Sequence, residues 1–191
     1  SGSTGKPKGV QIEHRSLVNH NLAVQRLFNL RPEDRMLQFQ SLAFDAALEE
    51  IFPTLISGAA LIIRPSGDLP TGEELLQWVD RWQITILDLP TAYWHALVSE
   101  VSLSKPPVPT SLRLVAVGGE KALTDKLQDW RNWAGDRVCW LNTYGPTEAT
   151  IIATSWLPPE TLPAGNLPIG KPIDNTRAYV LDRALQPVPA G

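Results

Sequence analysis

The chain alternates short apolar segments with amphipathic segments of about a dozen residues over most of its length. The short segments are predicted to be strands: 9–14, 36–39, 59–64, 84–90, 112–119 and 138–145. The amphipathic segments are predicted to be helices: 15–29, 45–57, 71–83, 91–101 and 124–135. Because strands that alternate with helices of this length are typical of βαβ units, the sequence predicts an α/β fold with a mostly parallel sheet flanked by helices.

The composition of the sequence changes near residue 151, where prolines, glycines and short strand-like runs replace the longer segments. We therefore expect residues 1–150 to form an α/β core and residues 151–191 to be a β-rich segment that begins a smaller β subdomain. The chain opens inside a glycine-rich loop and stops within the turn-like LQPVPAG. The core is accordingly expected to be incomplete, as an internal piece of a larger domain.

Charge and composition exclude several classes of protein. The formal net charge of −3 provides no basic surface for sequence-independent binding of nucleic acid. No apolar stretch reaches the roughly 18 residues that a membrane-spanning helix needs. The single cysteine, Cys139, rules out a disulfide framework and suits a reducing compartment. We expect a cytoplasmic protein that binds neither nucleic acid nor membrane.

The opening stretch, SGSTGKPKGV, has the composition of a phosphate-binding loop. Glycine, serine and threonine permit tight turns that direct backbone N–H groups at phosphate oxygens, and lysines neutralise phosphate charge. The spacing differs from the G-x-x-x-x-G-K-[ST] pattern, because Gly2 and Gly5 are three residues apart and Pro7 follows Lys6. A polar surface loop without a ligand is the alternative interpretation.

A second polar stretch, NTYGPTEAT, follows the last of these predicted strands. Because ligands of open parallel sheets bind beyond the carboxyl ends of the strands, this stretch is expected where a nucleotide would sit. Tyr144 is suited to stack on a purine, Asn142 to hydrogen-bond its edge, and Thr147 to contact a phosphate. Glu148 is suited to hold Mg²⁺. The glycines of VGGE, which ends another strand, would let the backbone approach a flat ring closely.

Four stretches, in this order, resemble the adenylation domains of nonribosomal peptide synthetases, which belong to the adenylate-forming, AMP-binding superfamily. They are SGSTGKPKGV, FDAALEEIFPTLISGAAL, NTYGPTEAT and LPIGKPIDNTRAYVLD. The resemblance covers the whole chain and implies part of the large N-terminal core of such a domain, without its C-terminal lid. It also implies that ATP and an amino acid give an aminoacyl-adenylate and pyrophosphate. The acyl group would then pass to the phosphopantetheine thiol of a peptidyl carrier protein, among neighbouring synthetase domains.

The resemblance further implies which residues contact ATP and Mg²⁺. Lys8, Thr147 and Glu148 would act on the phosphates, and Glu148 would hold the metal. Other nucleotide contacts would come from Ser1, Gly2, Ser3, Thr4, Gly5, Lys6, Gly9, Gly118, Gly119, Glu120, Asn142, Tyr144 and Gly145. The substrate carboxylate itself attacks the α-phosphate, so catalysis would be positioning and charge stabilisation. Since the family's ribose-binding aspartate and lid lysine lie outside the chain, we expect it to be inactive alone.

The resemblance also implies a pocket for the amino acid. In the family, an aspartate at the position of Asp45 binds the α-ammonium group of the substrate. The alternative is that Asp45 only caps the helix that follows it. The implied pocket residues are Asp45, Ala46, Glu49, Asp88, Val115, Val117, Thr143, Ile151 and Ile152.

Two further acids in this set, Glu49 and Asp88, suggest a cationic substrate side chain, because a buried carboxylate without a partner is costly. Lysine or ornithine fits best. The alternative is that Glu49 points to solvent or bonds a neighbouring backbone group, which leaves the substrate merely polar. Val117 is bulkier than the small residue often found at its place and would disfavour a long side chain.

Two other functions stay open at this point. One is an acyl- or aryl-CoA ligase of the same superfamily, against which Asp45 and the NTYGPTEAT stretch speak. The other is a non-catalytic nucleotide-binding module, against which the intact phosphate loop and the pair Thr147 and Glu148 speak.

Overall fold

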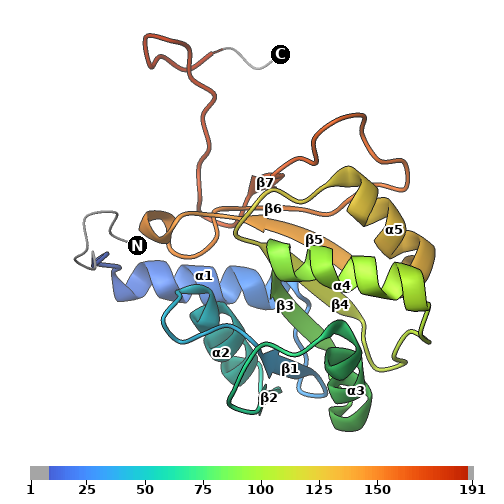
Figure 1. Cartoon of the computed structure of the whole chain (residues 1–191). Coiled ribbons are helices and arrows are strands. Elements are labelled where there is room, and N and C mark those ends of the chain that lie inside the picture. The colour runs from blue at the N-terminus through green and yellow to red at the C-terminus, as the bar shows by residue number, and fades with distance from the viewer. Residues whose placement is uncertain (1–8, 189–191) are drawn as a thin grey trace.

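Five parallel strands form the centre of the structure, a computed structural model that describes residues 9–188 (Figure 1). Two further strands continue the same sheet in antiparallel orientation, and the strand order is β2-β1-β3-β4-β5-β6-β7. The strands are β1 (Arg35–Gln38), β2 (Ala60–Ile63), β3 (Ile86–Pro90), β4 (Leu114–Gly118), β5 (Cys139–Tyr144), β6 (Thr154–Trp156) and β7 (Lys171–Pro172). The predicted α/β fold with a mostly parallel sheet is thereby confirmed.

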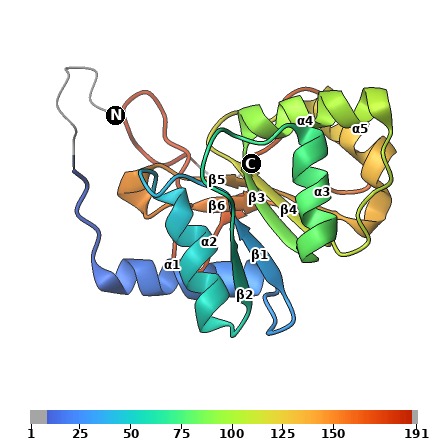
Figure 2. The same ribbon diagram turned by 60° about the horizontal axis from the view of Figure 1, so that its bottom comes forward.

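The helices cover both faces of this sheet (Figures 1 and 2). Helices α1 and α2 pack on one face, and α3, α4 and α5 pack on the other. Their bounds are α1 (His14–Leu27), α2 (Ala46–Ile56), α3 (Gly72–Trp82), α4 (Thr91–Ser104) and α5 (Thr124–Ala134), with short 3₁₀ turns η1 (Gly135–Arg137) and η2 (Thr147–Ala149). Each of these α-helices overlaps a helix that the sequence predicted.

Strand β4 shows how the sequence divides its side chains between the two cores. Leu114 and Ala116 pack with α1 residues, whereas Val115 and Val117 pack with residues of α3, α4 and α5. Successive side chains of a strand point to opposite faces, so an unbroken apolar run is needed where helices cover both sides.

The strand predicted at 9–14 is wrong. Residues 9–13 have no regular structure, and α1 already begins at His14. The apolar side chains that suggested a strand, Val10 and Ile12, are exposed. Alternation of apolar and polar residues makes a strand only where a neighbouring strand pairs with it, and among the described residues none does.

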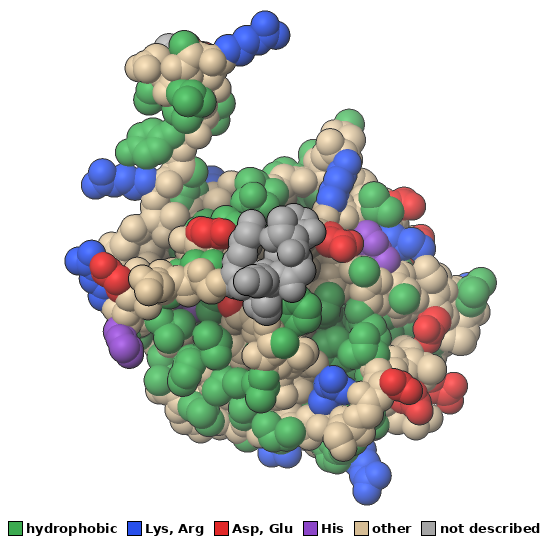
Figure 3. Space-filling model, turned by 60° about the vertical axis from the view of Figure 1, so that its left-hand side comes forward, with side chains coloured by type: hydrophobic (Ala, Val, Ile, Leu, Met, Phe, Trp, Pro, Cys, Tyr) green, Lys and Arg blue, Asp and Glu red, His purple; other side chains and the backbone are tan. Residues whose placement is uncertain are grey.

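The segment after residue 150 begins by extending the sheet through β6 and β7. Its later part runs away from the helices, as the red trace in Figure 1 shows. The outer surfaces of α1 and α2 carry exposed apolar side chains, which gather on the side of the molecule seen in Figure 3. Within the described range, no helix has the length and apolar character needed to cross a membrane.

Candidate active site

A cavity of about 450 Å³, called the first cavity below, lies at the carboxyl ends of β3, β4 and β5. Parallel strands place their carboxyl ends at one edge, where ligands of such sheets bind. Predicted site residues that line it are Asp45, Ala46, Glu49, Asp88, Gly118, Gly119, Glu120, Thr143, Gly145, Ile151 and Ile152. Lining residues that sequence reasoning missed are Gln40, Phe44, Pro90, Thr91 and Ala92.

Most of the missed residues follow strand ends. Gln40 lies two residues after β1, and Pro90 to Ala92 form the junction between β3 and α4. The rule that predicted the region applies to these strand ends too and could have found them. Thr91, which is buried, holds the loop after β4, because its hydroxyl lies 2.9 Å from the carbonyl oxygen of Gly118 and 3.0 Å from that of Glu120.

Val115 and Val117 do not line the first cavity, which corrects the predicted pocket. Asp88 pairs in register with Ala116, so Ala116 shares its face of the sheet. Both valines point to the opposite face, where they are fully buried against α3, α4 and α5. Gly118 stands at the cavity instead, and the expected obstruction by Val117 is absent.

Glycine is needed at this position of β4. A Cβ atom on Gly118 would lie 2.6 Å from the hydroxyl oxygen of Thr143 and 3.1 Å from its carbonyl oxygen. The strand end of β5 therefore packs directly against the end of β4, and the space above them stays open.

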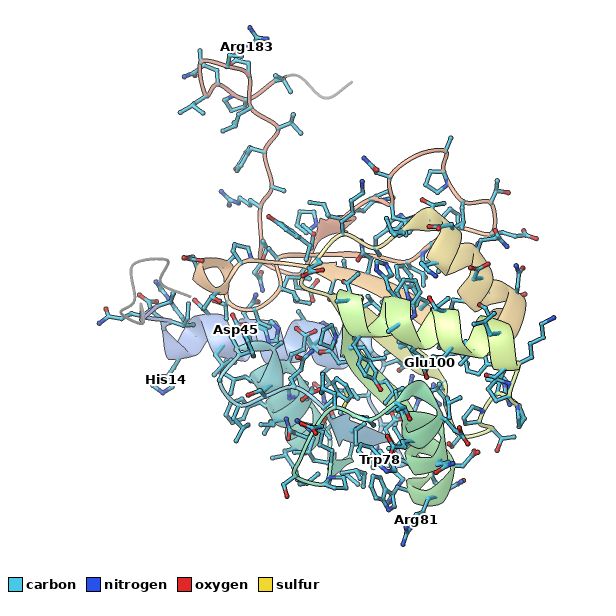
Figure 4. The ribbon with its side chains drawn as sticks, viewed as in Figure 1. His14, Asp45, Trp78, Arg81, Glu100 and Arg183 are labelled. Carbon is cyan, nitrogen blue, oxygen red and sulfur yellow. The ribbon has the colours of Figure 1, made fainter. Side chains whose placement is uncertain are left out.

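Asp45 immediately precedes α2 (Figure 4). Its side chain makes no capping hydrogen bond to the helix, so the capping interpretation is not supported. One carboxylate oxygen, Oδ2, is buried and has no hydrogen-bond partner among the described residues. Because a buried carboxylate oxygen is normally satisfied, this one is suited to a ligand that donates hydrogen bonds or carries positive charge.

Glu49 neither points to solvent nor bonds a backbone group. It is buried, and its Oε2 lies 2.8 Å from Nε2 of His20, a buried residue of α1. Asp88 is buried nearby and accepts no hydrogen bond from the described residues. Burial, together with the neighbouring Glu49 and Glu50, raises the pKa of Asp88 well above its ordinary value. The floor of the first cavity is thus strongly acidic.

Glu50 points away from the cavity and has a structural role. Its carboxylate accepts hydrogen bonds from the backbone N–H groups of Phe39 and Gln40, at 3.0 and 3.1 Å, and from the side-chain amide of Gln38. These contacts tie the end of β1 to α2. Burial nevertheless raises the pKa of Glu50 from 4.5 to about 8.

We expect the stability of the folded protein to fall as the pH rises between about 5 and about 8. The folded state keeps a proton on Glu50 that the unfolded state releases, so rising pH favours unfolding. The expected loss is about 2–4 kcal/mol, measured by urea unfolding across this range. Glu50→Gln has no such proton to lose and should reduce the slope, with the remainder due to Asp88, whose pKa is also raised. An unchanged slope in this variant would contradict the assignment.

The predicted nucleotide residues at the end of β5 and in η2 lie beside the first cavity. Tyr144 is half exposed, and Thr147 and Glu148 are exposed in η2. Asn142 is buried and does not line the cavity; its side-chain N–H donates to the carbonyl oxygen of Pro168 at 2.8 Å. Gly9 is exposed, and the predicted loop residues Ser1, Gly2, Ser3, Thr4, Gly5, Lys6 and Lys8 lie outside the described residues.

Glu148 is the residue predicted to hold Mg²⁺. Within residues 9–188, no group of three metal-ligating side chains comes together. A single exposed carboxylate fits a magnesium ion that is held mainly by substrate phosphates and water, as this ion often is in phosphate-binding sites.

Curated relatives match the chain along its whole length. It is 44% identical over 186 residues to isonitrile lipopeptide synthase of Streptomyces coeruleorubidus, covering 97% of this chain and 13% of the synthase. It is 42% identical over 192 residues to the dimodular nonribosomal peptide synthase of Bacillus subtilis, covering 100% of this chain and 8% of that protein. The chain thus spans a small part of the relatives it matches.

Solved structures share the fold. The α-methyl-L-serine-AMP bound form of the nonribosomal peptide synthetase FmoA3 superposes with a TM-score of 0.86 at 30% identity, covering 97% of this chain and 21% of that one. NpsA-ThdA of Klebsiella oxytoca, an artificially fused adenylation–PCP di-domain, superposes with a TM-score of 0.83 at 27% identity. The match covers 99% of this chain and 37% of that one.

A model of one protein family, the AMP-binding enzymes, matches residues 1–191. The parallel sheet, the cavity at its carboxyl edge and the relatives agree with this match. The chain belongs to the family of AMP-binding enzymes and resembles the adenylation domains of nonribosomal peptide synthetases.

Proposed function

We propose that the chain forms part of a ligase that activates an amino acid with ATP for nonribosomal peptide synthesis. The observation that carries this proposal is Asp45, whose buried and unpartnered carboxylate oxygen belongs to a residue lining the first cavity. An α-ammonium group would satisfy that oxygen, whereas a fatty or aryl acid offers no such group. The α-methyl-L-serine-AMP held by FmoA3 is an adenylate of this kind, which supports the assignment.

The reaction needs positioned groups rather than a protein nucleophile. A carboxylate oxygen of the amino acid forms a bond to the α-phosphorus of ATP. The bond from that phosphorus to the α,β-bridging oxygen breaks, and pyrophosphate leaves with the electron pair. Asp45 would fix the ammonium end of the substrate, and Gly118 and Gly119 would let the nucleotide approach the backbone.

The nucleotide contacts are proposed for the end of β5, the stretch that follows it and the opening loop. Tyr144 would stack on the adenine, while Thr147 would contact phosphate, together with Lys8 and its neighbours. Glu148 would contribute one ligand to Mg²⁺, which on binding neutralises phosphate charge. The downstream partner would be a peptidyl carrier protein with its phosphopantetheine thiol; the fused di-domain of NpsA-ThdA shows that such a pairing suits this fold.

We propose a basic substrate side chain, with lysine or ornithine as the best fit. Glu49 and Asp88 both line the first cavity, and Asp88 has no partner among the described residues. An ammonium group between them would relieve the repulsion that otherwise makes Asp88 take up a proton. Gly118 has no side chain, and Val117 points to the opposite face of the sheet, so the cavity has room for a long substrate side chain.

Amino-acid-dependent exchange between ATP and pyrophosphate tests both levels of this proposal. We expect the full-length protein that carries this chain to respond best to lysine or ornithine, in a panel with arginine, leucine and norleucine. Glu49→Gln and Asp88→Asn should each lower kcat/KM for the basic substrate by about 10- to 100-fold, because each removes a charge-assisted contact. The value of kcat/KM for norleucine, which lacks the side-chain ammonium group, should change little.

The possible outcomes separate the alternatives. Exchange driven by a neutral amino acid would retain the reaction and contradict the basic pocket. Exchange driven only by aryl or fatty acids would favour an acyl-CoA ligase. A protein that binds ATP but exchanges with none of these acids would favour a non-catalytic module.

A further inference from the structure

His20 is a buried titratable residue that the proposed reaction does not use. It lies on α1, is 1% exposed, and places Nε2 at 2.8 Å from Oε2 of Glu49, which is also 1% exposed. Its other ring nitrogen, Nδ1, lies 3.2 Å from Oδ1 of Asn21. Both ring nitrogens thus face oxygen atoms. Because a carboxylate oxygen accepts hydrogen bonds, the ring donates to Glu49 from Nε2.

The pair lies between two cavities. Glu49 lines the first cavity, whereas His20 lines a second one of about 380 Å³, together with Arg15 and Thr150. Among the described residues, no side chain of α1 lines the first cavity. The hydrogen bond from His20 to Glu49 links α1 directly to a residue that lines this cavity.

The surrounding acids explain why Glu49 needs the histidine. Glu50 has three N–H donors and Asp88 has none among the described residues. Glu49 has one donor partner, His20. A buried carboxylate without a partner is costly, so without the histidine the side chain of Glu49 would be free to turn away from the cavity. It would then no longer contact a cation bound there.

Resting on the proposed function, we propose that His20 is a positioning residue for the substrate side chain. Its ring holds Oε2 of Glu49 and fixes the direction of that carboxylate, so that the second oxygen, Oε1, is left for a cationic group in the first cavity. The selectivity for a basic amino acid then depends on a residue that does not touch the substrate.

The test is the ratio of kcat/KM for lysine to kcat/KM for norleucine, in pyrophosphate exchange by the full-length protein. Both values come from the same preparation, so a variant that is partly unfolded leaves the ratio unchanged. We expect His20→Leu to lower the ratio by about 10- to 100-fold, mainly through KM for lysine. His20→Gln retains an N–H donor of similar reach and should keep the ratio within about threefold.

His14→Leu is the matched control, because His14 lies on the same helix and is exposed. It should leave the ratio unchanged. If His20→Leu does not fold, His20→Asn takes its place, since the shorter amide does not reach Glu49. The double variant His20→Asn with Glu49→Gln should then have the same ratio as Glu49→Gln alone, because both substitutions remove one interaction.

Two results would overturn the inference and leave the proposed function in place. In one, His20→Leu or His20→Asn lowers kcat/KM equally for lysine and norleucine, while Glu49→Gln lowers kcat/KM for lysine alone. In the other, the His20 and Glu49 substitutions act additively. If instead the wild-type protein does not prefer lysine, and Glu49→Gln and Asp88→Asn change nothing, the basic-substrate proposal itself fails.

Discussion

Asp45→Asn is expected to lower kcat/KM for amino-acid-dependent pyrophosphate exchange by at least about 100-fold. The substitution keeps the size of the side chain and removes its charge. The α-ammonium group of the substrate would then enter the first cavity without a counter-charge. The rest of the cavity floor, at Glu49 and Asp88, is proposed to be engaged by the substrate side chain.

Two measurements separate this effect from damage to the fold. Asp45 has a buried oxygen without a partner, so the neutral amide should unfold at the same temperature as the wild type or a higher one. In addition, 6-aminohexanoate, which is lysine without its α-amino group, should be equally poor with the wild type and the variant. A variant that loses stability, or one that keeps its activity with lysine, would contradict the role of Asp45.

The fold followed from the sequence because its main signal is local. Each apolar segment of β1 to β5 is bounded by turn residues and followed by a segment in which apolar residues recur with the helical period. This pattern is visible without any contact information. The position of the first cavity followed as well, since the carboxyl ends of parallel strands meet at one edge. The strand expected at 9–14 failed because pairing is not a local property.

The details of the site depended on information that the sequence does not carry locally. The valines of β4 were misplaced because the strand alternates by residue, and only the register between Asp88 and Ala116 decides which set faces the cavity. The contact of Glu49 with His20 joins residues 29 apart in the chain, on two helices whose packing angle no motif predicts. An acid that looked unpaired in sequence thus proved to have a partner.

A strained segment between η2 and β6 contributes Ile151 and Ile152 to the wall of the first cavity. Thr150 and Ile151 are β-branched, yet their φ angles are 66° and 70°. Each such residue costs about 1–3 kcal/mol and persists only where its surroundings hold it. The backbone N–H of Ala153 donates to the carbonyl of Tyr144 at 2.8 Å, which fixes the segment across the end of β5.

Gly145→Ala is therefore expected to destabilise the protein by more than about 3 kcal/mol. A Cβ atom on Gly145 would lie 2.5 Å from both the carbonyl oxygen of Ile151 and the Cα of Ile152, so backbone rather than a flexible side chain must move. Since Ile151 and Ile152 line the first cavity, exchange activity should fall by about 100-fold. Thermal unfolding and pyrophosphate exchange of the full-length variant measure the two effects.

Gly165→Ala provides the comparison that isolates the contact. Gly165 has a φ of 89° and nothing within 4 Å of an added Cβ, so its substitution carries backbone strain alone. The expected cost is about 1–2 kcal/mol, with little change in exchange activity. Gly145 has no positive φ, so a loss there comes from the contact with residues 151–152 and not from backbone strain. If Gly145→Ala cost no more than Gly165→Ala, the contact would be relieved by a small shift and the expected effect would be wrong. A large loss at Gly145 alone, together with lost exchange, would mean that the cavity keeps its shape because one glycine lets two backbone segments meet.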